Sequence, residues 1–221
     1  MAFYDSADLL AELKAVLQTA SNTADTTDAQ YYRLLQNAQI RIARLLATHV
    51  PHANRIVELL TTADSGYTYT FAYYPLGHAE LRDGRGGALV MPASDWNPNG
   101  FVMEGQTVRM PNGQPRTFAN GLYARYCRTP GELSASTAPI LKPDDARLAI
   151  VYDAAVELAS QGNAMDKTPY AILKRNYLWG DPEVPGDVGL IQSLKNQYYG
   201  QGAMAQASEK WWAGQDWTNG S

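Results

Sequence analysis

The sequence predicts an α+β protein in which a helical core is interrupted by an inserted antiparallel β region and followed by an extended C-terminal tail. Three observations support this class. Near both ends of the chain, apolar residues recur three and four positions apart, as on one face of a helix. Between these regions, short segments rich in β-branched and aromatic residues alternate with turn sequences. From residue 200 onward, Gly, Gln, Ala and Ser make up most of the sequence.

These patterns divide the chain into four segments. Residues 1–54 form an N-terminal helical hairpin, which combines with residues 129–199 into one helical core of about five helices. Residues 55–128 form the inserted β-rich region, and residues 200–221 form an extended arm.

Two amphipathic helices open the core. The first begins at Asp5 or Ser6 as its N-cap, and the second begins at Thr27 or Asp28 and is closed by Pro51. A polar linker separates them, which predicts a helical hairpin. Their apolar positions are Leu9, Leu10, Leu13, Val16, Leu17 and Ala20 in the first helix, and Tyr31, Leu34, Leu35, Ala38, Ile42, Leu45 and Leu46 in the second.

The β-rich region contains about five to seven short strands of one antiparallel sheet. The turn sequences between them are "ADSG", "RDGRGG", "DWNPNG" and "PNGQP". The strand segments are "RIVELLTT", "YTYTFAYYP", "HAELRD", "GALVMP", "FVMEGQTVRMP" and "GLYARYCRTP".

The first helix after the insertion is apolar on almost all sides. It starts near Pro143 and stops at Gly162, and such a helix must be buried on most faces, within a domain or between subunits. Two further helices follow, one in "TPYAILKRNYLWG" with Thr168 as N-cap and Pro169 in its first turn, and one in "GDVGLIQSLKNQYYG".

Composition argues against several classes of protein. A net charge of -4 disfavours a nucleic-acid binder that acts by bulk electrostatics, because such proteins concentrate Lys and Arg. Cys127 is the single cysteine, so no intrachain disulfide can form. We expect a soluble, unprocessed protein with no membrane partner. The excess of 14 Tyr over 4 Phe suits packed but partly wet interfaces.

No catalytic or metal-binding constellation is evident. Cys127 lies in an expected strand, where a thiol is usually a small buried side chain. His49 and His52 flank Pro51, which breaks the helix that would place them on one face, and His78 is the third histidine. We therefore expect no catalytic residue, no metal, no cofactor and no enzymatic activity.

Two acids on the apolar helix share one face, because Asp153 and Glu157 are four residues apart. They could act as a general acid/base pair, but we expect them to face solvent or to meet Arg or Lys of a neighbouring chain. With Tyr152, they mark this helix as a candidate inter-subunit element.

"RDGRGGA" has glycines but lacks the Gly-Lys-Ser/Thr ending of a phosphate-binding loop. We interpret it as a flexible hairpin tip that carries Arg82 and Arg85 toward a neighbouring subunit or a polyanion.

The tail carries Trp211, Trp212 and Trp217, three of the five tryptophans. Buried tryptophans are frequent binding hot spots, so we expect these three to dock on a partner protein.

The order of these segments resembles that of the head-to-tail adaptor (head-completion, connector) proteins of tailed bacteriophages. The resemblance covers roughly residues 5 to 200. The segments that carry it are "TTDAQYYRLLQNAQIRIARLL", "VELLTTADSGYTYTFAYYPLGHAELRDGRGGALVMPASDW", "ILKPDDARLAIVYDAAVELASQGNAMD" and "YLWGDPEVPGDVGLIQSLKNQY".

This resemblance implies a ring of identical subunits, expected to be twelvefold, below the portal of a virion. The ring would extend the DNA channel without sequence-specific binding and would offer a surface to tail or stopper and nozzle proteins. Family members tend to attach to the portal through their C-terminal segments. The chain is thus expected at the head-tail interface, after assembly in the host cytoplasm.

Two other classes stay open. The chain could be a stopper or tail-completion factor at the same joint. It could also be a β-rich carbohydrate- or protein-binding module, with Trp96, Tyr73 and Tyr74 as the contact residues for a glycan. An enzyme that uses the acids above is the remaining alternative.

Overall fold

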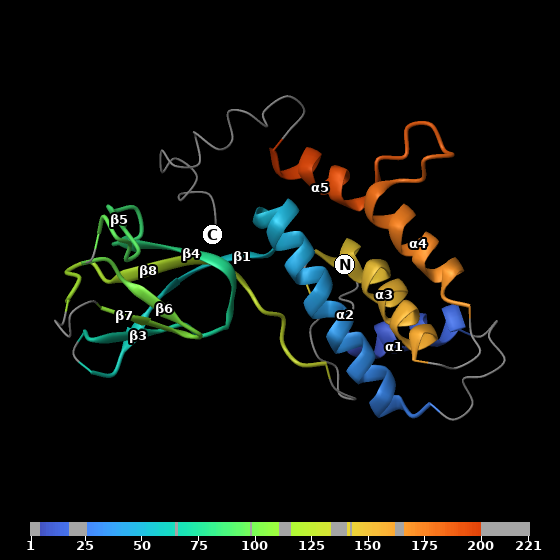
Figure 1. Cartoon of the computed structure of the whole chain (residues 1–221), viewed down its shortest axis with the longest axis horizontal. Coiled ribbons are helices and arrows are strands. Elements are labelled where there is room, and N and C mark those ends of the chain that lie inside the picture. Colours follow the sequence, from blue (N-terminus) through green and yellow to red (C-terminus); the bar gives the residue numbers. More distant parts are fainter. Residues whose placement is uncertain are drawn as a thin grey trace. The chain divides into compact units, whose positions relative to one another are not determined.

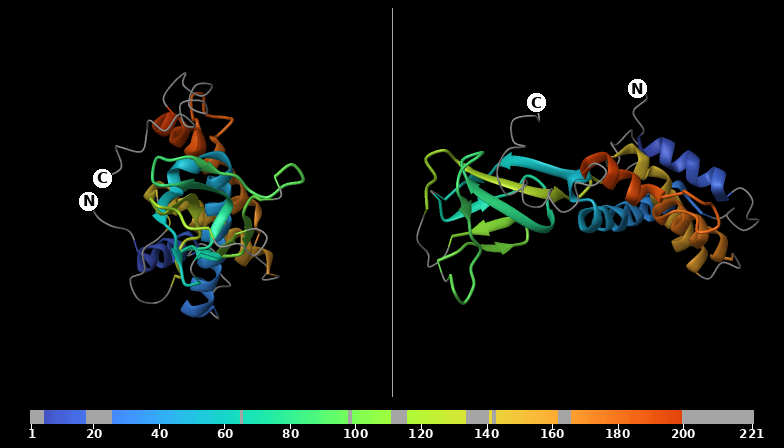
Figure 2. Two further views of the ribbon diagram at one scale, coloured as in Figure 1. Left: turned by 90° about the vertical axis from the view of Figure 1, so that its left-hand side faces the viewer. Right: turned by 90° about the horizontal axis from the view of Figure 1, so that it is seen from above.

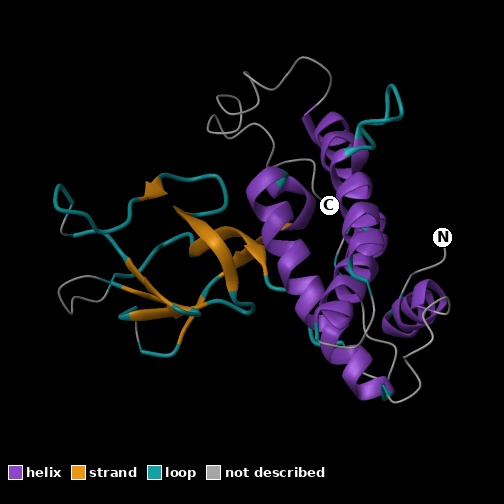
Figure 3. Ribbon diagram, turned by 45° about the vertical axis from the view of Figure 1, so that its right-hand side comes forward, coloured by secondary structure: helices purple, strands orange, loops and turns teal. Residues whose placement is uncertain are grey.

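The computed structural model describes residues 5–17, 26–64, 66–97, 99–110, 116–133, 141, 143–161 and 166–199. It confirms the α+β class, with α-helices and two antiparallel sheets (Figure 1). The described residues of Met1–Asn54 and Pro130–Tyr198 form one compact unit, the helical unit. Those of Arg55–Thr129 form a second, the β unit. Helices and strands are distinguished by colour in Figure 3.

The helical unit is built around α3 (Arg147–Ser160), which packs against α1 (Ser6–Leu17), α2 (Asp28–His49) and α4 (Thr168–Trp179). Figure 2 shows these helices from two further sides. The short helices η1 (Pro51–Asn54) and η3 (Asp144–Ala146) precede β1 and α3, and α5 (Gly189–Tyr199) follows α4. The apolar sides of α3 are therefore covered within its own domain, one of the two arrangements expected from the sequence. The largest fully buried side chains of this unit are Leu9, Leu13, Leu17, Leu35, Ile42, Leu46, Ile150 and Ile191.

Local hydrogen bonds fix where the helices begin. The Asp5 carboxylate accepts hydrogen bonds from the Ala7 and Asp8 N–H groups at 2.8 and 3.1 Å. Thr27 and Gln30 form a capping box at the start of α2. The prediction for α4 is wrong by one position, because Thr168 is its first helical residue and Lys167 precedes it as the N-cap.

A buried glutamine connects α2 to the chain that returns from the β unit. Gln39 has no solvent exposure. Its Nε2 donates to the Gly131 carbonyl at 3.1 Å, and its Oε1 accepts from the Leu141 N–H at 2.8 Å. Gln36, one helical turn earlier, accepts from the Leu133 N–H at 2.9 Å. Irregular backbone can lie against α2 because these side chains satisfy its polar groups.

The β unit contains two four-stranded sheets, and every strand pairing described is antiparallel. The first has the order β1-β8-β4-β5 and the second β2-β3-β7-β6. Their strands are β1 (Arg55–Leu59), β2 (Thr61–Thr62), β3 (Thr68–Thr70), β4 (Pro75–Asp83), β5 (Leu89–Val90), β6 (Val102–Glu104), β7 (Thr107–Arg109) and β8 (Leu122–Arg128).

The expectation of one sheet with five to seven strands is wrong, for a physical reason. Leu60 separates β1 from β2, so the chain leaves the first sheet and enters the second at this residue. The Leu60 side chain is buried in a core that both sheets share. Two small sheets that share one core can bury apolar residues that a single open sheet would leave in water. This core contains Leu60, Tyr69, Phe71, Ala79, Leu81, Val90, Phe101, Val108, Met110, Phe118, Leu122, Ala124 and Tyr126.

Tyr126 is the largest fully buried side chain of this core. Its hydroxyl donates to Glu58 Oε1 at 2.8 Å and accepts from the Tyr73 N–H at 3.4 Å, while its ring lies edge-on to Phe71. Burial, followed by the hydrogen bond to Glu58, raises the pKa of this hydroxyl. The Tyr126 hydroxyl therefore stays protonated at neutral pH, where it serves as a hydrogen-bonding group of the core.

The Gln39 contacts lead to a first prediction. Replacing Gln39 by Met keeps the side-chain volume but leaves the buried Leu141 N–H without its acceptor and the carbonyl of the exposed Gly131 without its donor. The free energy of unfolding of the helical unit should fall by about 1–3 kcal/mol, measured by urea titration with circular dichroism at 222 nm. The matched control is Gln197→Met, an exposed glutamine on α5, which should change the stability by less than about 0.5 kcal/mol. Equal effects of the two substitutions would contradict this role.

Candidate interaction surfaces

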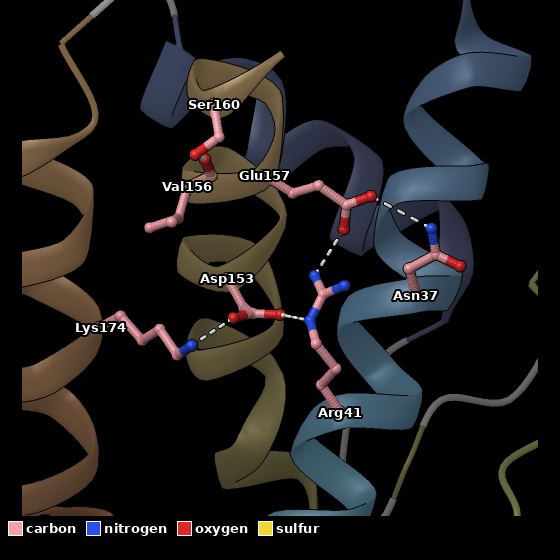
Figure 4. A network of polar contacts seen from close by, with 7 residues as sticks. All are labelled: Asn37, Arg41, Asp153, Val156, Glu157, Ser160 and Lys174. Carbon is pink, nitrogen blue, oxygen red and sulfur yellow. Dashed lines mark hydrogen bonds and ion pairs between the residues drawn. The ribbon is translucent and has the colours of Figure 1, made fainter.

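The acidic pair predicted on α3 binds cations of its own chain (Figure 4). Arg41 of α2 lies between the two acids, with its Nε 2.6 Å from Asp153 Oδ2 and a terminal nitrogen 2.6 Å from Glu157 Oε2. Lys174 of α4 binds the other oxygen of Asp153, and Asn37 donates to Glu157 at 3.2 Å. The Asp153 side chain therefore connects three helices.

Burial makes this network structurally important. Asp153 is only 3% exposed. A carboxylate with so little access to water is costly unless cations and hydrogen bonds compensate. Burial by itself lowers the pKa of Arg41, but its hydrogen bonds to Glu157 and Asp153 outweigh that effect and raise it. Arg41 is thus a permanent cation in this position.

These contacts correct the prediction for Asp153 and Glu157. The two acids were expected to face solvent or to meet basic residues of a neighbouring chain, with acid/base chemistry as the alternative. Both instead form ion pairs within the chain. The third residue of this set, Tyr152, is half-buried and lies edge-on to Tyr177 at a centroid distance of 6.0 Å.

Tyr152 lines an open groove on the helical unit, hereafter the α4–α5 groove, with a volume of about 740 Å³. Its apolar residues come from α4 and from the segment between α4 and α5. Three of them have large exposed fractions: 44% for Leu173, 53% for Val184 and 46% for Val188. The other lining residues are Asp145, Asn176, Tyr177, Asp181, Asp187, Gly189, Leu190 and Ser193.

Hydrogen bonds hold the segment between α4 and α5 in shape. The Asp187 carboxylate accepts from the Asp181 N–H at 2.8 Å and from the Gly189 N–H at 3.1 Å, and these bonds lower its pKa. Gly180 has φ +91°, and a Cβ atom there would lie 2.3 Å from the Asp187 carbonyl oxygen. Only glycine fits this approach of two backbone segments, so this wall of the groove is preformed.

The groove has the composition of a protein-binding surface. Apolar walls that are exposed together, with polar groups around them, mark interaction sites on soluble proteins. Further exposed apolar residues of α4 are Ile172 and Trp179, and the Trp179 ring lies edge-on to His49. Sequence analysis did not predict the groove, because its lining residues come from η3, α3, α4, α5 and the segment between α4 and α5. The signal in the sequence was the pair Val184 and Val188 in a segment otherwise rich in turn residues.

The interpretation of Arg82 as a loop residue is wrong. Arg82 belongs to β4 and is 8% exposed. Its Nε lies 2.6 Å from Glu80 Oε1, and a terminal nitrogen donates to the Gly87 carbonyl at 3.1 Å. The buried Arg82 side chain therefore stabilises the turn between β4 and β5. Arg85 does lie in the exposed turn between β4 and β5, where sequence analysis placed it.

Trp96 is the most exposed apolar side chain of the described residues, at 96%. It occupies the tip of a tight turn, where Ser94 and Asn97 exchange backbone hydrogen bonds of 3.1 and 3.0 Å. Tyr73 and Tyr74 are also exposed, but Tyr73 packs against the Arg128 guanidinium and Tyr74 is near Gly105. Among the described contacts, none joins Trp96 to either tyrosine.

The remaining candidate residues carry no site in the described part of the chain. No group of three His, Cys, Asp or Glu side chains in that part could hold a metal ion. Cys127 is buried, and burial raises the pKa of its thiol although Arg55 acts in the opposite direction. None of the described helices is both long and apolar enough to span a bilayer. Trp211, Trp212 and Trp217 lie outside the described residues.

Comparison with known proteins gives no relative. No family model matches the chain, and no curated protein is significantly similar to it in sequence.

The network around Asp153 leads to a second prediction. Asp153→Ala removes the carboxylate and leaves Arg41 and Lys174 facing each other, which should lower the free energy of unfolding by about 3 kcal/mol. Lys174→Met should cost about 1 kcal/mol, because Arg41 still pairs with Asp153. Chemical denaturation followed by circular dichroism measures both.

The control for this prediction is Glu132→Ala, which replaces an exposed acid and should change the stability by less than about 0.5 kcal/mol. An Asp153→Ala variant as stable as this control would contradict the network's role.

The raised pKa of Cys127 leads to a third prediction. The thiolate is the reactive form, so a buried thiol with a raised pKa should react slowly with Ellman's reagent at pH 8. We expect a rate at least about 100-fold below that in 8 M urea. Since the folded-state pKa lies above the unfolded value, stability should also fall as the pH rises past about 8.5. Equal rates in native buffer and in urea would contradict the buried thiol.

Proposed function

We propose that this chain is a structural subunit of a tailed-phage virion that forms a ring below the portal. In this proposal the ring is expected to be twelvefold, extends the DNA channel and offers the surface on which tail or stopper and nozzle proteins attach. Its C-terminal arm docks on the portal, and the protein performs no catalysis. The segment order that resembles head-to-tail adaptor proteins supports this assignment.

The observation that carries the proposal is the preformed, open α4–α5 groove. Leu173, Val184 and Val188 remain exposed on one face of a chain whose other large apolar side chains are mostly buried. An assembly subunit needs such surfaces, because identical copies can only form a ring if each presents two different complementary faces.

Charge supports the same function. A net charge of -4, with 18 basic against 22 acidic residues, suits a channel through which DNA must move. A strongly basic lining would hold the DNA by releasing its counterions.

The ring function can be tested by negative-stain imaging of the purified chain, alone and mixed with the portal protein encoded by the same genome. The expected result is a ring of this chain bound to one end of the portal. A stopper or tail-completion protein would join only after another adaptor had bound. A chain that stays monomeric and never joins the portal complex would overturn the proposal.

The docking arm gives a fourth prediction. Replacing Trp211, Trp212 and Trp217 together by Ala should leave the thermal unfolding of the chain nearly unchanged and abolish its attachment to the portal. Each buried tryptophan anchor commonly contributes about 2 kcal/mol or more. The matched control replaces the same three residues by Phe, which keeps aromatic surface and should retain most of the attachment. Undiminished attachment of the Ala variant in a pull-down assay would refute the docking role.

A further inference from the structure

We propose that Trp96 of one copy of this chain inserts into the α4–α5 groove of a second copy; this inference rests on the ring function proposed above. The contact would join the β unit of one subunit to the helical unit of the next.

The backbone of the turn that carries Trp96 is held by local contacts. Besides the reciprocal hydrogen bonds of Ser94 and Asn97, the Asn97 side chain donates to the Pro92 carbonyl at 3.2 Å. Gly100 passes so close to Pro92 that a Cβ atom on it would lie 2.2 Å from the Pro92 backbone. Phe101, which follows, is buried in the core of the β unit. Because the loop backbone is already ordered, binding would cost mainly the two side-chain torsions of the indole, which favours its use as an anchor.

The groove matches the chemistry of an indole ring. Its apolar walls, Leu173, Val184 and Val188, can cover the faces of the ring. Carboxylates of Asp181 and Asp187 lie in the same lining and can accept a hydrogen bond from the indole N–H. Tryptophan needs this combination of apolar contact and one acceptor when it becomes buried.

The two surfaces also have opposite charge. Residues 55–129 contain seven Arg and no Lys against six Asp and Glu, whereas residues 1–54 and 130–198 together contain ten Lys and Arg against fourteen Asp and Glu. The groove adds three acids, Asp145, Asp181 and Asp187. On the β side, Arg85 lies in the exposed turn that leads into β5, and the Trp96 turn follows that strand. The formal charges of the two units are therefore of opposite sign, +1 for the β unit and -4 for the helical unit, although the exposed Asp95 beside Trp96 is itself acidic.

This contact joins two different surfaces of the same chain. Every copy carries one Trp96 turn and one groove, so each can bind one neighbour on either side. Such head-to-tail contacts form a ring where the rotation between neighbours closes, as the proposed function requires.

Two single variants of the full-length chain test the contact. Trp96→Ala removes the anchor and keeps the groove, whereas Leu173→Glu places a charge in the groove and keeps the anchor. Both side chains are exposed, and thermal unfolding verifies that each variant folds. If Leu173→Glu fails to fold, Val184→Glu replaces it. The controls are Tyr74→Ala, an exposed aromatic residue of the β unit, and Gln197→Glu, an added acid on α5 outside the groove lining.

Sedimentation velocity over a concentration series then measures self-association. Each variant alone should self-associate about 30-fold more weakly than the unaltered chain, the loss typical of a tryptophan hot spot. An equimolar mixture of the two variants should form a one-to-one dimer that does not grow, because it contains one intact anchor and one intact groove. Both controls should behave like the unaltered chain.

The outcomes separate this contact from the ring function. If either variant self-associates like the unaltered chain, if the mixture stays monomeric, or if the unaltered chain is monomeric at every concentration, the contact is wrong. Variants that still form normal rings on the portal would reject the contact and leave the ring function standing. Self-association that requires Trp96 and the groove, in a chain that never joins the portal, would support the contact and reject the ring function.

Discussion

A single buried carboxylate determines how the central helices are arranged. Asp153 is almost inaccessible to water, and its charge is compensated by Arg41 and Lys174. A shift of α2 or α4 along α3 would separate one of these two cations from the acid and weaken that compensation. The positions of α2 and α4 against α3 are thereby coupled, and α4 supplies one wall of the α4–α5 groove. The shape of the α4–α5 groove therefore depends on an ion-pair network whose acids lie outside its lining.

The β unit has an equivalent constraint in its shared core. Tyr126 and Phe71 pack against each other between the two sheets, and Glu58 satisfies the Tyr126 hydroxyl. The core residue Phe101 ends the loop that presents Trp96, so the exposed tryptophan is positioned by buried packing nearby. The groove lies in one unit and the exposed Trp96 in the other, and each is positioned by the buried packing of its own unit.

Several site residues could be anticipated from the sequence, and their environments could not. The spacing of Asp153 and Glu157 placed both on one face of a helix, but their cations come from residues that are distant in sequence, which periodicity along α3 cannot reveal. Arg82 was taken for a loop residue because glycines surround it, whereas its alkyl chain is buried and its guanidinium binds Glu80. Trp96, in contrast, was placed in a turn sequence and named as a contact residue for a glycan, and its side chain is exposed.

By itself, the sequence determined the α+β class, the helical segments and most of their ends, because apolar periodicity and capping residues act over a few neighbouring positions. Tertiary structure decided the division of the β region into two sheets, the burial of α3 within its own unit, and the assembly of the α4–α5 groove. These outcomes depend on which distant surfaces pack together to exclude water and pair charges. Such contacts are properties of the folded chain as a whole, and no local pattern encodes them.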